Sequence, residues 1–235
     1  MTQSYKMALS IARNRNRGCE VYGCLNHAHG FGAFCTKHHM RRQRFGHPEA
    51  RPVTRRDLRP YRAAVAAFLR DNESHTAVAA AREFFQTLLD TSRLTTTGHV
   101  KSSQKLAHHL AYAKSQGTDG TQLLTEALAV SALAEDQPRR FKDDQHRLFV
   151  LARRILQVSP LCRYGVCGGR PVYVYAAMGP TILRELSRLI QGRMARFLIV
   201  AGQEVIKRMG LSTRPIEVTE PFSSNSPKQQ VSPTP

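Results

Sequence analysis

CEVYGCLNHAHGFGAFCTKHH, residues 19–39, contains three of the five cysteines of this 235-residue chain. Cys19 and Cys24 form a Cys-x4-Cys pair, and after ten intervening residues Cys35 and His38 form a Cys-x2-His pair. Structural zinc takes four tetrahedral ligands, and two short-spaced pairs joined by a loop supply them because each pair turns back on itself. Gly23 suits the tight turn before Cys24, where a residue without Cβ is least strained. The spacing therefore predicts a zinc site made of Cys19, Cys24, Cys35 and His38.

The fourth ligand is the open part of this prediction. His38 has the best spacing, whereas His39 is its neighbour and His27 or His29 could reach in from the loop. The alternative to a metal site is a chance cluster of free thiols. An odd number of clustered cysteines, with no export signal before them, favours metal or free thiols over disulfides and indicates a reducing cytoplasm. A module this small has too little core to fold alone, so zinc would supply its folding free energy.

The run from Cys19 to Pro48 resembles a small zinc-finger module of phage and mobile-element proteins, which often precedes HNH-type endonucleases. Its pattern is Cys-x4-Cys, an aromatic or glycine-containing loop, Cys-x2-His and an Arg-rich helix ending in Gly-x-Pro. The second half here is CTKHHMRRQRFGHP. It matches the pattern at the ligands Cys35 and His38, in the basic helix with Arg41 and Arg44, and at the Gly46–Pro48 terminator. This chain has His39 where the pattern has Tyr, and Arg42 where it has Trp. The resemblance covers about 30 of the 235 residues.

The net charge of the chain is +18, from 35 Lys and Arg against 17 Asp and Glu, and more than half of it lies in the first 62 residues. Such a balance attracts polyanions, meaning nucleic acid or an anionic membrane face. A basic helix held by a metal site between flexible basic arms could follow a phosphate backbone. The alternative is a solvated basic face with no partner. The residues predicted to contact nucleic acid are Arg13, Arg15, Arg17, Arg41, Arg42, Arg44, Arg55 and Arg56.

Composition divides the chain into four parts. We predict a basic zinc-finger-like module at 1–48, a Pro- and Arg-rich linker at 49–60, a helical domain at 61–211 and a disordered tail at 212–235. Three prolines between 48 and 60 favour extended backbone in the linker, and Pro, Ser and Gln dominate the tail. With 41% hydrophobic residues, the chain can bury a sizeable core.

Apolar residues recur at helical spacing along the predicted domain. This periodicity predicts helices at 63–69, from 72 to about 89, and at 100–115, 121–134, 139–158 and 181–209. Turn signals and alternation predict one short β-hairpin at 162–176. The apolar stripe of the last helix could be core or a dimer seam, and core is the safer interpretation. The predicted fold class is mainly α: a small N-terminal zinc-bound module plus an all-α helical domain with one short β-hairpin.

Beyond residue 48 the sequence offers few candidates for an active site. An HNH core requires a hairpin and a helix that carry two His and an Asn, and the pair His108 and His109 points to different faces of a helix. Asp143 and Asp144, with His146 close by, fit an acidic first helix turn better than a metal cluster. Cys162 and Cys167 could be half of a second zinc site or two packed apolar residues. We therefore predict no catalytic residues.

The function predicted from the sequence is non-catalytic binding of nucleic acid, with DNA favoured, by an accessory or regulatory protein of a bacterial mobile element or phage. The first alternative is a divergent metal-dependent, HNH-like nuclease. The second is a protein-interaction or assembly factor in which zinc only stabilises the fold of the N-terminal segment. We expect no membrane partner, because no run approaches about 18 apolar residues, and a homo-oligomer could form through the helical domain.

Overall fold

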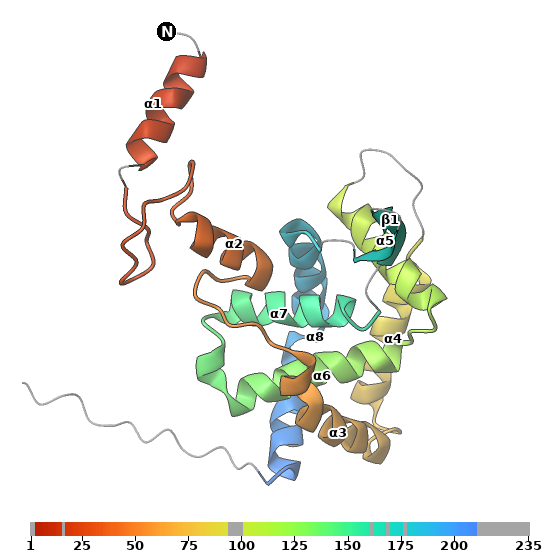
Figure 1. Ribbon diagram of the computed structural model, residues 1–235. Coiled ribbons are helices and arrows are strands. Elements are labelled where there is room, and N and C mark those ends of the chain that lie inside the picture. Colours follow the sequence, from red (N-terminus) through yellow and green to blue (C-terminus); the bar gives the residue numbers. More distant parts are fainter. Residues whose placement is uncertain are drawn as a thin grey trace, which may run out of the picture.

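The computed structural model describes residues 3–15, 17–93, 101–159, 162–167, 170–175 and 178–210. Most of the described residues are helical, which confirms the predicted mainly α fold class (Figure 1). The helices are α1 (Gln3–Arg15), α2 (Thr36–Phe45), α3 (Arg55–Asp71), α4 (Thr76–Asp90), α5 (Ser102–Ser115), α6 (Gly120–Asp136), α7 (Asp144–Leu156) and α8 (Pro180–Arg208), with a 3-10 turn at Pro138–Arg140.

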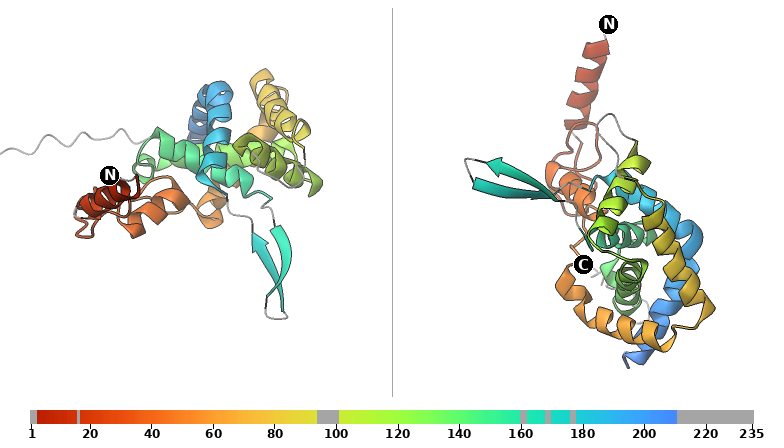
Figure 2. Two further views of the ribbon diagram at one scale, coloured as in Figure 1. Left: turned by 90° about the horizontal axis from the view of Figure 1, so that it is seen from above. Right: turned by 90° about the vertical axis from the view of Figure 1, so that its right-hand side faces the viewer.

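Helix α6 is the centre of the helical body. Its sequence is apolar on nearly every side, and a helix of that kind is stable only when other elements cover it all round. It packs against α3, α4, α7 and α8, and twelve of its seventeen residues are buried. The right-hand view of Figure 2 looks along α6 and α7 and shows the other helices of the body arranged around them.

Helix α8 crosses α6 at close range. A Cβ at Gly202 would lie 3.1 Å from the backbone carbon of Ser131 on α6. The predicted apolar stripe of this helix is buried in the core at Ile182, Leu186, Ile190, Leu198 and Val205. The stripe is therefore core, as the safer interpretation expected.

Helix α3 begins inside the segment predicted to be an extended linker, so that expectation is wrong from Arg55 onward. A capping box starts the helix: the Asp57 amide donates to the Thr54 hydroxyl at 3.3 Å, and the Thr54 amide donates to the Asp57 carboxylate at 2.7 Å. Pro60 lies in the second turn, where it removes one backbone hydrogen bond. Burial of residues such as Leu58 and Val65 offsets that loss.

The start of α4 also differs from prediction. Asn72 was expected to open this helix, but it ends α3. There its side-chain Nδ2 donates to the Phe68 carbonyl at 2.8 Å. The residue that caps α4 is His75, whose Nδ1 accepts from the Ala77 amide at 3.2 Å. A short polar loop between two helices offers several caps, and the sequence alone does not decide which residue is used.

Two strands, β1 (Cys162–Cys167) and β2 (Arg170–Tyr175), pair antiparallel with Cys162 opposite Tyr175 and Cys167 opposite Arg170. They project from the helical body in Figure 2. Cys162 and Cys167 stand at the two ends of β1, about 16 Å apart at the rise of an extended strand. The strand is extended between them, without a turn, and the hypothesis that their thiols form half of a second zinc site concerns side chains outside the described part of the chain.

The N-terminal residues are helical, whereas a flexible basic arm was expected there. Helix α1 extends away from the body in Figures 1 and 2, with Tyr5, Met7 and Leu9 exposed. The predicted disordered tail, 212–235, lies outside the described residues.

The contact between α4 and the start of α6 allows a sharp test of the packing. A Cβ at Gly120 would lie 2.7 Å from the Arg82 carbonyl oxygen and 2.7 Å from the Gln86 amide nitrogen, both backbone atoms of α4. We expect Gly120→Ala to lower the free energy of unfolding by about 1–3 kcal/mol because the helices must separate. Urea denaturation measures the loss. Gly192→Ala on α8 is the control, because its Cβ would meet nothing within 4 Å, and an equal loss there would contradict this packing.

Candidate metal centre and basic surface

The first ligand pair is held by a tight loop. The Cys24 amide donates to the Val21 carbonyl at 3.0 Å, and the Cys19 amide donates to the Asn26 carbonyl at 2.9 Å. Gly23, between them, has φ +73°, a left-handed conformation that glycine adopts without the strain of a side chain. These contacts fold the Cys-x4-Cys segment back on itself, as its spacing predicted.

The second ligand pair is fixed by the start of α2. Cys35 is the N-cap of this helix, with extended φ and ψ, and the His39 amide donates to its carbonyl at 2.8 Å. His38 follows in the first turn, on the same side as Cys35. The Glu20 amide donates to the Ala33 carbonyl at 3.0 Å, which ties the first loop to the segment entering the helix.

The four predicted ligands come together. The Nδ1 atom of His38 lies 3.3 Å from the Cys19 Sγ and 3.4 Å from the Cys35 Sγ, and the Sγ atoms of Cys24 and Cys35 are 3.9 Å apart. All four ligand atoms lie within 4.8 Å of one another. Tetrahedral zinc with bonds of about 2.0–2.3 Å places its ligand atoms roughly 3.5–3.8 Å apart. The cluster therefore has the dimensions needed to hold a metal ion.

The thiols are free, and none of the three is in a disulfide. Burial works against ionisation of Cys19, but hydrogen bonds from the Cys35 and Val21 backbone, from His38 and from Cys24 outweigh it and lower its pKa to about 6. The His38 backbone lowers the pKa of Cys35, but burial and the neighbouring thiols Cys19 and Cys24 outweigh that effect and raise it. A bound cation would favour the thiolate form of both groups.

The other candidates for the fourth ligand are turned elsewhere. His27 and His29 are exposed in the loop. The Nε2 atom of His39 lies 2.8 Å from the Gln43 amide nitrogen. Among the described residues, His38 is the histidine that completes a group of metal-binding size with the three cysteines.

The predicted basic residues come from three helices and, at Arg17, from the loop before Cys19. Arg41, Arg42 and Arg44 lie on α2, which has no acidic residue in its first turn and no buried residue. The guanidinium of Arg42 stacks over the Phe34 ring at 5.4 Å, so this arginine is held in place by the metal loop. Arg17 pairs with Glu20.

The remaining predicted contacts are dispersed. Arg13 is exposed on α1, and the side chain of Arg15 lies outside the described part of the chain. Arg55 and Arg56 form the first turn of α3, where the Arg55 guanidinium donates to the Gln157 carbonyl at 3.0 Å. The structure therefore brings Arg55 toward α7, whereas α1 carries Arg13 away from the body.

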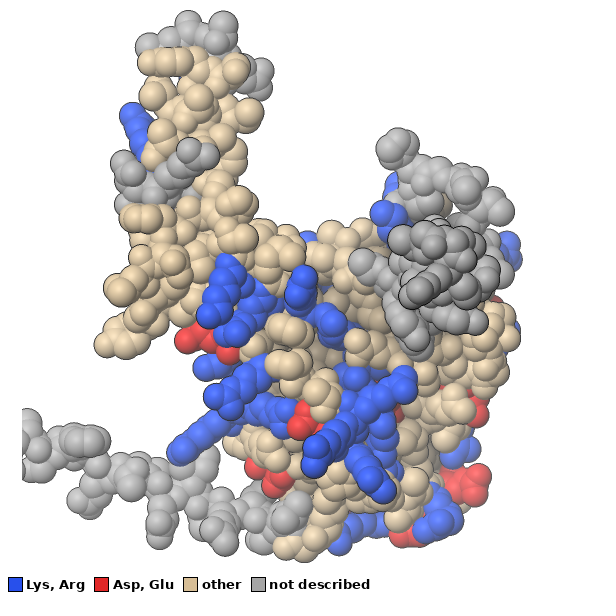
Figure 3. Space-filling view, in the orientation of Figure 1, with Lys and Arg blue, Asp and Glu red and all other residues tan. Residues whose placement is uncertain are grey.

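Helix α2 lies between two concave surfaces lined with arginine, and sequence reasoning missed most of these residues. On one side, Arg42 faces Arg184 and Arg188 of α8 across a groove of about 460 Å³. On the other side, Arg153 and Arg154 of α7 line a smaller hollow with Arg51 and Arg55. Figure 3 shows Lys and Arg gathered over the face that carries α2, α7 and the start of α3. The sequence does show adjacent arginines on the predicted helices. Only the packing of α7 and α8 against α2 shows which of these arginines lie beside the metal cluster.

Two of the residues weighed for catalysis, Asp143 and His146, lie at the start of α7. The Asp143 carboxylate caps α7 by accepting from the His146 amide at 2.6 Å, as the first-turn interpretation expected. His146 is 1% exposed, and its Nδ1 accepts from the Lys142 amide at 3.2 Å. Burial, followed by repulsion from His47, lowers the pKa of His146. Within the described ranges, the Cys/His group is the cluster of metal-binding size.

Comparison with known proteins found no family model, no curated protein and no solved structure that matches this chain. No described helix is long and apolar enough to cross a membrane. The class of molecule that fold and site define is thus a helical protein with an N-terminal Cys3His cluster able to hold a metal ion.

Proposed function

We propose that the protein binds nucleic acid, with duplex DNA as its target, through a zinc-held module that presents the arginines of α2. The observation that carries the proposal is the direct coupling of the metal cluster to a basic helix. Cys35 caps α2 and His38 lies in its first turn, so the cluster fixes the helix that carries Arg41, Arg42 and Arg44.

Zinc is the proposed metal because three thiol ligands and one imidazole nitrogen form a donor set that structural zinc prefers. Four protein ligands leave no open coordination position, which fits a structural role and not a hydrolytic one. We therefore propose an accessory or regulatory role without catalysis, in a bacterial phage or other mobile element as the resemblance of Cys19–Pro48 implies.

The charge of the surrounding surface supports a polyanionic partner. Arginines line both sides of α2, and the lining of neither concave surface includes a carboxylate. Arginine matches phosphate oxygens with paired N–H donors, which favours it at phosphate-tracking surfaces. Phosphate contacts supply affinity without sequence information, so the proposal extends to DNA binding and not to a particular site.

The experiment is a titration of labelled duplex DNA at several salt concentrations with the wild type and the Arg41/Arg42/Arg44→Ala triple variant. For the wild type we expect the logarithm of the binding constant to fall linearly with the logarithm of salt concentration, because bound arginines release counterions. Each lost phosphate contact should lower the slope by about 1, so the triple variant should bind more weakly with a slope reduced by about 2–3.

The control variant, Arg70/Arg193/Arg196→Ala, removes three exposed arginines from α3 and α8, away from α2. It should retain most of the wild-type affinity. Wild-type binding without a salt slope, or equal loss in both triple variants, would contradict the proposal. Absence of DNA binding would favour the protein-interaction alternative.

A further inference from the structure

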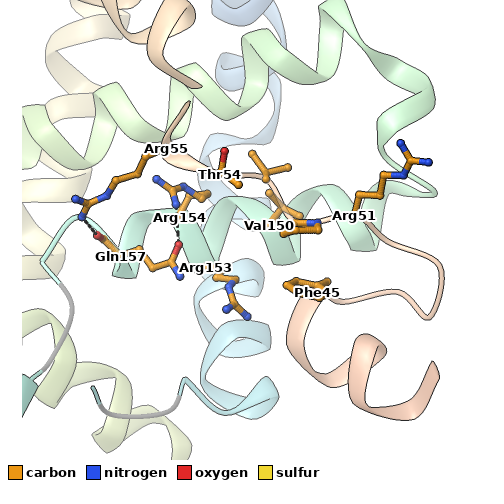
Figure 4. A pocket seen from close by; sticks show the side chains of 10 residues that line it. Phe45, Arg51, Thr54, Arg55, Val150, Arg153, Arg154 and Gln157 are labelled. Carbon is orange, nitrogen blue, oxygen red and sulfur yellow. Dashed lines mark hydrogen bonds between the residues drawn. The ribbon is translucent and has the colours of Figure 1, made fainter. Parts of the chain in front are cut away.

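A hollow of about 280 Å³ lies where the segment after α2 crosses α7 (Figure 4). Its base is apolar, with Phe45 from the end of α2 and Val150 from α7. Arginines from the α2–α3 connection, from the first turn of α3 and from α7 border this base. We call it the arginine hollow, and the residues that line it are Phe45, Arg51, Pro52, Val53, Thr54, Arg55, Val150, Arg153, Arg154 and Gln157.

The positive charge of the arginine hollow is only partly balanced by the protein. Arg154 is 5% exposed and pairs with Glu126 at 2.8 Å, but Glu126 also pairs with Arg62 at 2.6 Å. For Arg51, Arg55 and Arg153, the described part of the chain shows no ion pair with a carboxylate. One carboxylate is thus shared between two guanidinium groups, and three further arginines border the same space.

Two of these arginines are held in place by neutral groups. Arg55 donates to the Gln157 carbonyl at 3.0 Å. Arg153 donates to the Arg44 carbonyl at the end of α2, and its guanidinium stacks over the Phe45 ring at 5.6 Å. Both keep further N–H donors, since a guanidinium carries five. Arg55 and Arg153 are therefore held in place by the protein, whereas Arg51 is exposed at the edge of the hollow.

The crowding has an electrostatic cost that an anion would relieve. Burial is the main cause that lowers the pKa of Arg153, and repulsion from Arg154 and Arg44 adds to it. Burial likewise lowers the pKa of Arg154 in spite of Glu126, and Arg62 and Arg55 add repulsion. A negatively charged ligand in the hollow would stabilise the charged form of each group.

We propose that the arginine hollow binds a phosphate group of the nucleic acid, so that the helical body grips the strand beside the zinc-held module. This inference rests on the proposed function for the source of the phosphate. Phosphate fits because its oxygens accept paired N–H donors from arginine, and the arginines spaced along the hollow match a strand that carries successive phosphates. The position fits because Arg153 contacts the last turn of α2 directly, which makes the hollow continuous with the basic face of that helix.

The test uses the full chain, two probes and one matched control. Arg51→Gln/Arg55→Gln removes two exposed arginines of the hollow without touching the Arg153 contact to α2, and Arg70→Gln/Arg193→Gln removes the same charge elsewhere. The first probe is inorganic phosphate, compared with chloride at equal ionic strength by the shift of the urea unfolding midpoint. The second probe is labelled duplex DNA titrated across salt.

We expect phosphate to raise the unfolding midpoint of the wild type and the control, and not that of the Arg51/Arg55 variant. DNA affinity should fall about tenfold in the Arg51/Arg55 variant, with a salt slope lower by about 1–2, and less than about twofold in the control. Equal effects in the two double variants would overturn the inference. The proposed function would survive that result if the α2 triple variant still lost binding.

The same experiment distinguishes failure of the proposed DNA binding from failure of phosphate binding in the hollow. If the wild type did not bind DNA but phosphate protected it through Arg51 and Arg55, the hollow would take a small phosphate ligand, and the proposed function would be wrong. If phosphate protected no variant more than chloride did, and DNA binding ignored Arg51 and Arg55, the hollow would hold no phosphate at all.

Discussion

Removing the metal from the Cys19, Cys24, Cys35 and His38 cluster is expected to unfold residues 17–46 and to leave α3–α8 folded. Burial within this segment is small: Ala28 and Cys35 are its buried apolar residues, and α2 buries none. Tyr22 is 101% exposed and Leu25 97% exposed. Apolar packing therefore cannot hold this loop, and a structural zinc ion, at about 10–16 kcal/mol, can.

Hydrogen–deuterium exchange with and without a chelator measures this directly. Amides that bond across the loop, such as Cys19 to Asn26 and Glu20 to Ala33, should lose protection by orders of magnitude when metal is removed. Amides of α6 should not change. The variant His38→Gln should behave like the metal-free protein, and His27→Gln, an exposed histidine of the same loop, should behave like wild type. Unchanged protection after complete metal removal would contradict a metal-held module.

The second large effect is expected at Glu126 inside the helical body. Its carboxylate, 4% exposed, accepts from Arg62 Nε at 2.7 Å and from Arg154 Nε at 2.9 Å. Glu126→Gln would leave the nearly buried Arg154 guanidinium without a counter-charge. Breaking a buried ion pair from one side costs about 3–5 kcal/mol, and urea unfolding should show a loss of that size.

The exposed pair of Arg188 and Glu185 on α8 is the matched control, because the Arg188 side chain is 77% exposed. Surface pairs contribute about 0–1 kcal/mol, so Glu185→Gln should cost little. Replacing the buried pair together, as Glu126→Leu with Arg154→Met, should recover much of the stability, since well-packed apolar residues can substitute for a buried pair. A loss below about 1 kcal/mol for Glu126→Gln would contradict a buried, structural role.

The metal cluster was predictable because its geometry is local. Cys-x4-Cys and Cys-x2-His each close through a few backbone hydrogen bonds, and only the loop between them spans a longer distance. Even the choice among four histidines follows from this, since His38 shares the first turn of α2 with the N-cap Cys35. Spacing along the chain therefore carried nearly all of the information.

The body was predictable in its helices and less so in their ends. Apolar periodicity located the central part of each helix from α3 to α8, since burial of one stripe drives helix packing. It did not locate the start of α3, because the three prolines indicated extended backbone where the structure has the Thr54–Asp57 capping box. Helix α1 was also missed, since it has exposed Tyr5, Met7 and Leu9 and no buried stripe that periodicity could detect.

The arginine-lined surfaces could not be found from sequence, for a physical reason. Arg153 belongs with Arg51 only because α7 packs beneath the segment that leaves α2, and their separation of about a hundred residues carries no periodic signal. Charge composition pointed to the first 62 residues. The structure adds arginines of α7 and α8 to that basic face. Part of the positive charge of the helical body therefore lies beside α2.

The most direct measurement is the affinity for one duplex DNA of three samples: the zinc-loaded protein, the metal-free protein and the metal-free protein after zinc is restored. If the cluster fixes α2 for binding, removal of zinc should weaken DNA binding by about tenfold or more at moderate salt, and zinc should restore it. Equal affinity in all three samples would contradict the account, because the arginines of α2 would then bind, or fail to bind, without the metal that positions them.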